Sequence, residues 1–221
     1  MARHNISNAD ELFWGDAYEP KANGSRRGVP LHPTLQVDLG APVAASANAI
    51  SLSQSVTGGV AALLNGALGG TLDVPRNVVA AWTNTAVCTV TGTDVYGRTL
   101  VESSASGTSM TGKKAFKTIT SVVFSASVTS ATVGTGDVLG LPYRIGGKFD
   151  ILAAYADTTA DIASATVVAG DATTPSATTG DVRGTYDPNT ACNGSVRFRL
   201  WLKPYGVKNR AEAYGVDQFA G

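Results

Sequence analysis

Histidines and cysteines, the residue types that most often serve as nucleophiles, general bases or zinc ligands, are scarce in this 221-residue chain. The two histidines are His4, close to the first residue, and His32, between Pro30 and Pro33. Neither has a second His or Cys at the spacing of a zinc site. A Ser-His-Asp or Cys-His arrangement would have to use one of them, and both lie in an irregular segment that is poorly suited to fixing a catalytic group. The sequence therefore predicts no catalytic residue, no metal, no cofactor and no enzymatic activity.

Aspartates are spread through the C-terminal third, where several carboxylates together would suit a hard cation such as calcium. They are Asp150, Asp157, Asp161, Asp171, Asp181 and Asp187. Their spacing matches no EF-hand or repeat loop, so solvated loop carboxylates are the favoured interpretation. Asp94 and Glu102 form another acidic pair, but the turn expected between them offers no cleft, which argues against a glycosidase.

The charge balance argues against a nucleic-acid partner. The chain has 17 Lys and Arg residues against 17 Asp and Glu residues, and 15% of its residues are charged, below the quarter or so usual for soluble proteins. Its densest positive groups are Arg26-Arg27 and Lys113-Lys114 with Lys117, interpreted as solvated turns or ion pairs with a neighbouring subunit. Weak mutual repulsion favours extensive protein contact. No apolar window is long enough to span a bilayer, so no membrane partner is expected.

The elements that must position these residues centre on the stretch from Val87 to Arg144, which is rich in Val, Thr, Ser and Ile. These residue types suit a pleated, half-buried surface. Segments 86–93 and 99–103 predict a hairpin with its tip at Tyr96 and Gly97. The alternation from Val122 through Val128 predicts one continuous strand. The glycines at 134, 136 and 140 predict a tight turn before a strand that ends at Tyr143.

The same stretch carries a resemblance to a known group of proteins. The strings TVTGTDVYGR, LVE, GKKAFKTITSV and VGTGDVLGLPYR lie in order within residues 87–144. Together they resemble virion structural proteins of tailed bacteriophages, the head-decoration or cement proteins. The resemblance implies a non-enzymatic protein that binds the lattice of the major capsid protein.

The rest of the chain predicts an all-β protein, because short Val-rich and Thr-rich segments alternate with Gly-rich breaks and no long helical pattern is present. The expected fold is an antiparallel β-sandwich or barrel with an irregular N-terminal arm and long loops. Residues 1–40 are expected to be an extended arm, residues 41–204 the β domain and residues 205–221 a tail. Val196, Phe198, Leu200 and Leu202 alternate with polar residues and predict a strand with one core face.

The two cysteines do not make a disulfide framework for a chain of this length. Cys88 falls in a predicted strand and Cys192 in a turn-rich segment. One packed thiol and one loop thiol are the favoured interpretation, and a disulfide between them stays open. The first residues lead into Asp10 and Glu11 and not into an apolar segment, so no secretory signal is expected.

Aromatic and apolar residues in the arm and the tail are the expected contacts with partners, because an arm without a core of its own needs a surface to lie on. These predicted contact residues are Leu12, Phe13, Trp14, Tyr18, Tyr214 and Phe219. The predicted function is a capsid cement or decoration protein on the exterior of the virion, assembled in the bacterial host cytoplasm. Its predicted partners are the major capsid protein and itself, as a homo-oligomer, with a trimer favoured over a dimer.

Two other functions stay open at this stage. One is a tail, adaptor or head-fibre component of the same kind of virion, present in few copies. The other is a carbohydrate-binding or receptor-binding β-sandwich, in which Trp82, Trp201 or Tyr96 would offer an aromatic platform.

Overall fold

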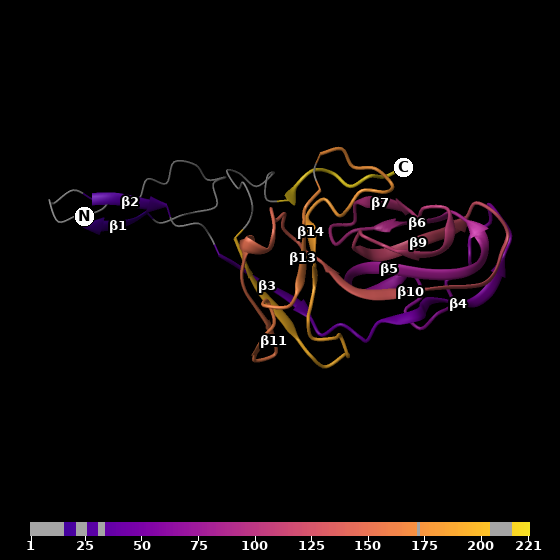
Figure 1. Ribbon diagram of the computed structural model, residues 1–221, viewed down its shortest axis with the longest axis horizontal. Helices are drawn as coiled ribbons and strands as arrows, with labels where there is room; N and C mark the ends of the chain where they lie inside the picture. Colours follow the sequence, from indigo (N-terminus) through magenta and orange to yellow (C-terminus); the bar gives the residue numbers. More distant parts are fainter. Residues whose placement is uncertain (1–15, 21–25, 31–33, 172, 204–213) are drawn as a thin grey trace.

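The computed structural model describes residues 16–20, 26–30, 34–171, 173–203 and 214–221. The all-β prediction is confirmed: the described elements are strands and one 3-10 turn, and the sheets are antiparallel. Strands β1 (Asp16–Pro20) and β2 (Arg26–Pro30) form a two-stranded sheet of their own, shown at the N-terminal end of the molecule in Figure 1. The other strands form a nine-stranded sheet and a four-stranded sheet beside it.

The nine-stranded sheet curls into a half-barrel. Its strands are β4 (Ser46–Val56), β5 (Thr71–Ala86), β6 (Cys88–Thr93), β7 (Thr99–Ser103), β8 (Gly107–Thr111), β9 (Phe116–Phe124), β10 (Val128–Gly140), β13 (Thr166–Ala169) and β14 (Gly184–Asp187). Long strands β5 and β10 pair at its centre. The outer edge of β10 is shared by β4 and β14, and the outer edge of β5 is shared by β8 and β9.

The four-stranded sheet has the order β12-β11-β15-β3. Its strands are β3 (Leu35–Gly40), β11 (Ile151–Ala156), β12 (Thr159–Ala160) and β15 (Phe198–Leu202), and the 3-10 turn Lys148–Asp150 precedes β11. The strand predicted from alternation is confirmed in β15, where Phe198, Leu200 and Leu202 are fully buried. The sequence predicted an extended arm for residues 1–40, whereas the structure places β3 within the four-stranded sheet. Val37 and Leu39 are buried in alternation with more exposed residues, but a strand of six residues is too short for this alternation to stand out in the sequence.

Two hydrophobic clusters form the core. The first fills the half-barrel and includes the buried Trp82, Val90, Phe116 and Phe124. The second lies between the four-stranded sheet and the strands β10 and β14, and includes the buried Ile145. Residues 41–204 thus contribute to two adjoining cores, and they share the second core with β3.

The predicted hairpin is confirmed: β6 pairs with β7 from Thr89↔Ser103 to Thr93↔Thr99. In the connection, the Asp94 Oδ1 accepts hydrogen bonds from the backbone N–H groups of Tyr96 and Arg98, at 2.8 and 2.9 Å. Gly97 has a φ of 77°, a conformation that costs glycine little. The tip lies where the sequence indicated.

The continuous strand predicted through residues 122–128 is wrong, because a turn separates β9 from β10. Ser125 and Ser127 stabilise this turn with their side chains. The Ser125 Oγ accepts a hydrogen bond from the Val87 N–H, and the Ser127 Oγ accepts one from the Gly58 N–H. Serine hydroxyls compete for backbone groups in this way and so favour turns over regular strand.

The glycines at 134, 136 and 140 lie inside β10 and not in a turn, so that prediction is also wrong. They permit close approach of the backbone in neighbouring strands. A Cβ at Gly134 would lie 1.8 Å from the Ser46 carbonyl oxygen of β4. A Cβ at Gly140 would lie 2.3 Å from the Ala115 Cβ.

We expect Gly134→Ala to lower the free energy of unfolding by about 3 kcal/mol, because the new methyl group would collide with the β4 backbone and force β4 away from β10. Gly107→Ala is the matched control, since no atom lies within 4 Å of the position of its Cβ. That variant should change stability by less than about 0.5 kcal/mol. Denaturant unfolding of both variants tests the expectation, and equal effects would contradict it.

Candidate functional site

The acidic pair Asp94 and Glu102 is occupied by the chain's own groups. Besides its two turn hydrogen bonds, Asp94 forms a buried ion pair with Arg183, at 2.9 Å. Glu102 accepts hydrogen bonds from the backbone N–H groups of Lys113 and Lys114, at 2.6 and 3.2 Å. Burial raises the pKa of the Glu102 carboxyl above its usual value, although these hydrogen bonds oppose the shift. Both carboxylates therefore accept hydrogen bonds or ion pairs from the chain's own groups and stabilise the fold.

Lys114 is fully buried, so its interpretation as a solvated residue is wrong. Its ammonium group donates hydrogen bonds to the carbonyl oxygens of Val101 and Ser176, at 3.0 and 2.6 Å, and lies 5.5 Å from the centre of the Phe219 ring. Burial lowers its pKa, while the negative charges of Glu102 and nearby aspartates oppose the change. The neighbouring Lys113 is exposed.

Asp181 extends this polar network to the end of the chain. Its Oδ2 accepts hydrogen bonds from the Ala115 N–H and from the Gln218 side chain, at 3.1 and 3.2 Å. The Val101 N–H on the edge of β7 donates to the Phe219 carbonyl oxygen, at 2.7 Å. We call Asp94, Glu102, Lys114, Asp181 and Arg183 the polar clasp, because they join the long loop and the final residues to the half-barrel.

Other aspartates that were interpreted as solvated are also buried. Asp161 accepts hydrogen bonds from the Tyr186 hydroxyl group and from the N–H groups of Asn189 and Thr190. Asp150 accepts one from the Gly146 N–H, at 2.6 Å. Within the described part of the chain, no three His, Cys, Asp or Glu side chains are grouped to hold a metal ion. In these irregular segments the carboxylates accept hydrogen bonds from backbone N–H groups that have no backbone carbonyl as a partner.

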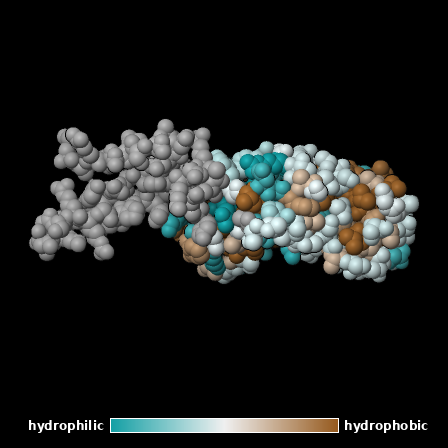
Figure 2. Space-filling model, turned by 90° about the horizontal axis from the view of Figure 1, so that it is seen from above, coloured by the Kyte–Doolittle hydropathy of each residue, from teal (hydrophilic) through white to brown (hydrophobic). Residues whose placement is uncertain are grey.

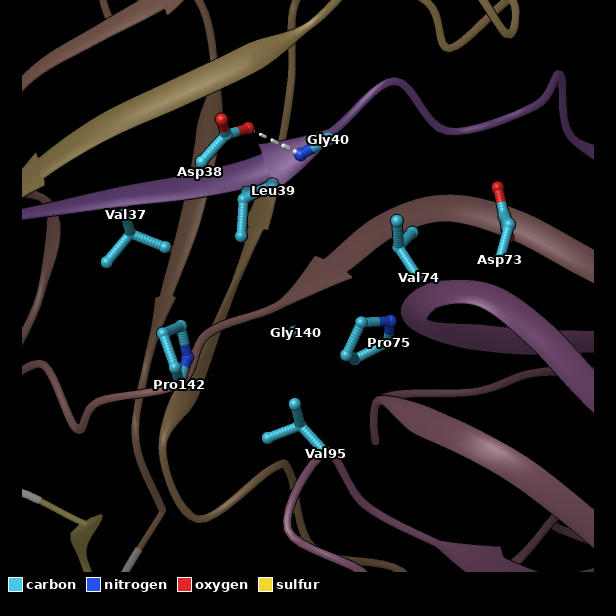
Figure 3. Close-up of a pocket in the computed structure, with 10 residues that line it drawn as sticks. All are labelled: Val37, Asp38, Leu39, Gly40, Asp73, Val74, Pro75, Val95, Gly140 and Pro142. Atoms are coloured by element: carbon cyan, nitrogen blue, oxygen red, sulfur yellow. Dashed lines mark hydrogen bonds between the residues drawn. The ribbon is translucent and has the colours of Figure 1, made fainter.

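Figure 3 shows an apolar cleft between the two sheets, with a volume of about 290 Å³. It is lined by Val37, Asp38, Leu39, Gly40, Asp73, Val74, Pro75, Val95, Gly140 and Pro142. Its two carboxylates already have partners: Asp38 pairs with Arg197 and Asp73 with the buried Arg76. The histidines His4 and His32 lie outside the described residues. The cleft thus combines apolar walls with two carboxylates that are already paired with arginines.

An exposed apolar surface lies where the loop after β4 runs beside that strand. Leu52, Val60 and Leu63 are 45%, 54% and 66% exposed, and we call them the loop patch. The Gln54 side chain holds this loop in place, since it donates to the Leu63 carbonyl oxygen and accepts from the Leu63 N–H. Hydrophobic residues also gather in Figure 2 at the end of the molecule farthest from the grey residues. The loop patch is therefore presented by fixed backbone.

A second exposed surface is the outer side of the four-stranded sheet. Tyr155 and Trp201 meet edge to face there, with ring centres 5.5 Å apart. Leu152, at a bulge in β11, is 55% exposed, and Arg199 lies opposite Tyr155 in the register. We call Leu152, Tyr155, Arg199 and Trp201 the aromatic face.

The predicted contact residues differ in their placement. Leu12, Phe13 and Trp14 lie outside the described residues, and Tyr18 belongs to β1. Tyr214 packs against Tyr96 and Tyr143, with ring centres 5.3 and 5.8 Å away, and the half-buried Phe219 adjoins the polar clasp. Both rings contact their own chain, and their role toward a partner stays a prediction.

Sequence reasoning missed most residues of these two surfaces. Val60 and Leu63 fall at helical spacing, but the glycines around them weaken a helix, so the sequence fits either a short helix or a glycine-rich loop. The structure shows the loop. Of the three suggested aromatic platforms, Trp82 is 5% exposed and packs on Phe124, so it offers no platform. Trp201 and Tyr96 reach the surface.

Comparisons with protein-family models, with curated proteins and with solved structures found no match for this chain. A search of the described residues found no helix of the length and hydrophobicity needed to cross a membrane.

We expect Lys114→Met to lower the free energy of unfolding by about 3 kcal/mol, because it leaves Glu102 buried without its nearest positive charge and two carbonyl oxygens without a donor. Lys113→Met is the control, since that exposed side chain has one long hydrogen bond, at 3.4 Å. It should change stability by less than about 0.5 kcal/mol. Denaturant unfolding measures both, and a stable Lys114→Met variant would contradict a stabilising role for the polar clasp.

Both thiols are free and buried, and burial raises the pKa of Cys88 and of Cys192 to about 12. Because the thiolate is the reactive form, we expect neither to react with an aromatic disulfide reagent at pH 8 while the protein is folded. In denaturant, both thiols of each chain should react within seconds. Rapid reaction of either thiol in the folded protein would contradict this burial.

Proposed function

We propose that this protein is a non-enzymatic structural component of a tailed-phage virion, a cement or decoration protein that binds the major capsid protein lattice from outside. The observation that carries the proposal is the loop patch, where Leu52 of β4 stays exposed beside Val60 and Leu63 of the following loop. Side-chain hydrogen bonds of Gln54 and Asn65 hold this loop against β4. A surface of this kind suits a protein interface with an apolar centre. The strings that resemble phage structural proteins also lie in the half-barrel that carries this loop.

The mechanism is stabilisation by binding. A protein that binds the assembled shell and not its separated subunits stabilises the shell by mass action. Several copies joined in a homo-oligomer, with a trimer favoured, would present the loop patch several times, so that weak contacts add through effective concentration. The formal net charge of zero leaves little electrostatic repulsion between neighbouring copies, which suits dense packing on a lattice. The copies would assemble in the host cytoplasm and occupy the exterior of the capsid.

Cryo-electron microscopy of purified virions tests the location. Hundreds of copies distributed over the icosahedral shell would support the proposal. A few copies at the portal, tail or a single vertex would support the tail, adaptor or head-fibre function instead. Absence from the particle would overturn both.

The aromatic face favours a second candidate, a carbohydrate-binding or receptor-binding β-sandwich. Tyr155 and Trp201 offer exposed ring surface, and Gln36 and Arg199 of the same sheet face offer hydrogen-bond donors. Aromatic rings beside planar polar groups are suited to the alternating apolar and hydroxyl surfaces of sugars. Binding in a glycan array that Trp201→Ala abolishes would favour this candidate.

We expect Leu63→Asp to weaken binding to expanded phage heads by at least about tenfold, because it places a charge at the centre of an apolar contact. The fold should be unchanged, since the side chain is 66% exposed. Val168→Asp on β13 is the control, with a side chain that is 53% exposed outside the loop patch. Sedimentation of each variant with empty heads measures binding, and equal binding by both variants would remove the loop patch from the interface.

A further inference from the structure

The aromatic face is an unpartnered surface that has a distinct charge. Register places Trp201 beside Ala153 and Gln36, and Arg199 beside Tyr155 and Asp38, all on the outer side of the four-stranded sheet. Leu152 and Tyr155 are 55% and 37% exposed. The face thus combines aromatic and aliphatic side chains with cationic groups in a single flat layer.

The positive charge of this face is only partly compensated. Arg197 forms an ion pair with Asp38, and the Asp157 carboxylate accepts a hydrogen bond from the Arg197 backbone N–H. Arg199 lies close enough to Asp38 to lower its pKa further, but Arg197 is the main cause of that shift. Among the described residues no ion pair is formed by Arg199 or by Lys203, which follows β15. An acidic partner is therefore the complement of this face.

One segment of the same chain has that complementary composition. Residues 10–19 read DELFWGDAYE and contain four acidic residues, no basic residue, and the side chains of Leu12, Phe13, Trp14 and Tyr18. Aromatic anchors flanked by acids match a surface of exposed rings flanked by Arg199 and Lys203. The apolar cleft of Figure 3 matches less well, because its own charged groups, Asp38 and Asp73, are acidic.

The position of this segment indicates that it binds another copy of the chain. β1 pairs with β2 in a sheet of two strands, separate from both larger sheets. Figure 1 shows this hairpin beyond the four-stranded sheet and not on its outer face. A two-stranded hairpin alone is marginally stable in water, so it needs a surface to pack on. β2 ends at Pro30 and β3 begins at Leu35, so the connection is short and spans at most about 18 Å.

We propose that residues 10–19 of one copy dock on the aromatic face of a second copy, and that this contact builds the homo-oligomer. The contact joins two different surfaces. Two copies can exchange their segments around a two-fold axis, and a head-to-tail arrangement generates a ring when its rotation closes. The favoured trimer is such a ring of three copies. The inference rests on the proposed association of several copies, and it is independent of the capsid as the place where they act.

Two charge-reversal variants of the full chain test the contact. The face variant carries Arg199→Glu and Lys203→Glu. The arm variant carries Asp10→Lys and Asp16→Lys, and it keeps Glu19, which lies opposite Arg27 in the β1–β2 register. Each alone brings like charges together, so each should associate at least about tenfold more weakly than the unmodified protein. In a chain that carries all four substitutions every arm meets a face of opposite charge, whatever the size of the ring, and the oligomer should return. Sedimentation velocity at a series of concentrations measures all four samples.

Recovery in the chain with all four substitutions also shows that these substitutions leave the chain folded, because only a folded chain can restore the complex. An unmodified protein that stays monomeric at all concentrations would overturn the inference, as would two-substitution variants that associate normally or a four-substitution chain that does not recover. Glycan binding that is abolished by Trp201→Ala, with self-association unchanged, would assign the face to sugars and overturn it too. Recovery in the four-substitution chain without any binding to phage heads would support the inference while the proposed function fails.

Discussion

The pairing of β5 with β10 is the constraint on which the rest of the structure depends. These two long strands are hydrogen-bonded along the centre of the nine-stranded sheet, and both contact the two hydrophobic clusters. β10 contributes Val133 to the first hydrophobic cluster and Leu139 to the second. β5 contributes Val78 to the first cluster, and its Val74 packs against the second. The two cores are therefore continuous through one strand pair.

Buried charges stabilise the region where β5 and β10 pass from the first hydrophobic cluster to the second. Arg76 of β5 is fully buried and donates hydrogen bonds to the carbonyl oxygens of Gly136 and Val43, at 2.8 and 2.9 Å. It also forms an ion pair with Asp137, at 3.0 Å. Together with the polar clasp, it satisfies backbone groups where the chain is irregular and no ladder partner is present. The long loop and the final residues are thus part of the folded body.

The groups that stabilise the fold are separate from the surfaces proposed for binding. Glu102, Lys114 and Asp181 are buried and hydrogen-bonded within the fold, whereas the loop patch and the aromatic face expose apolar, aromatic and cationic side chains. These two surfaces belong to different sheets. Under the proposed function, one copy would therefore use one surface for the lattice and the other for a neighbouring copy.

The sequence by itself determined the all-β class, the hairpin tip at Gly97 and the core face of β15, because each depends on residues that are near one another in the sequence. Glycine adopts the positive φ that the hairpin tip needs. A period of two in side-chain hydrophobicity is enough to identify the core face of a strand. Tertiary structure alone decided the fate of Lys114, Asp161 and Asp181, since their burial depends on carbonyl and N–H groups supplied by distant segments. It likewise decided that Gly134 lies within a strand, because the need for a glycine comes from the β4 backbone and not from its own neighbours in sequence. The exposure of Leu63 was set in the same way, by a loop that Gln54 fixes from another element. Sequence patterns report the preferences of a segment, whereas burial and close approach are properties of the partners that segment meets.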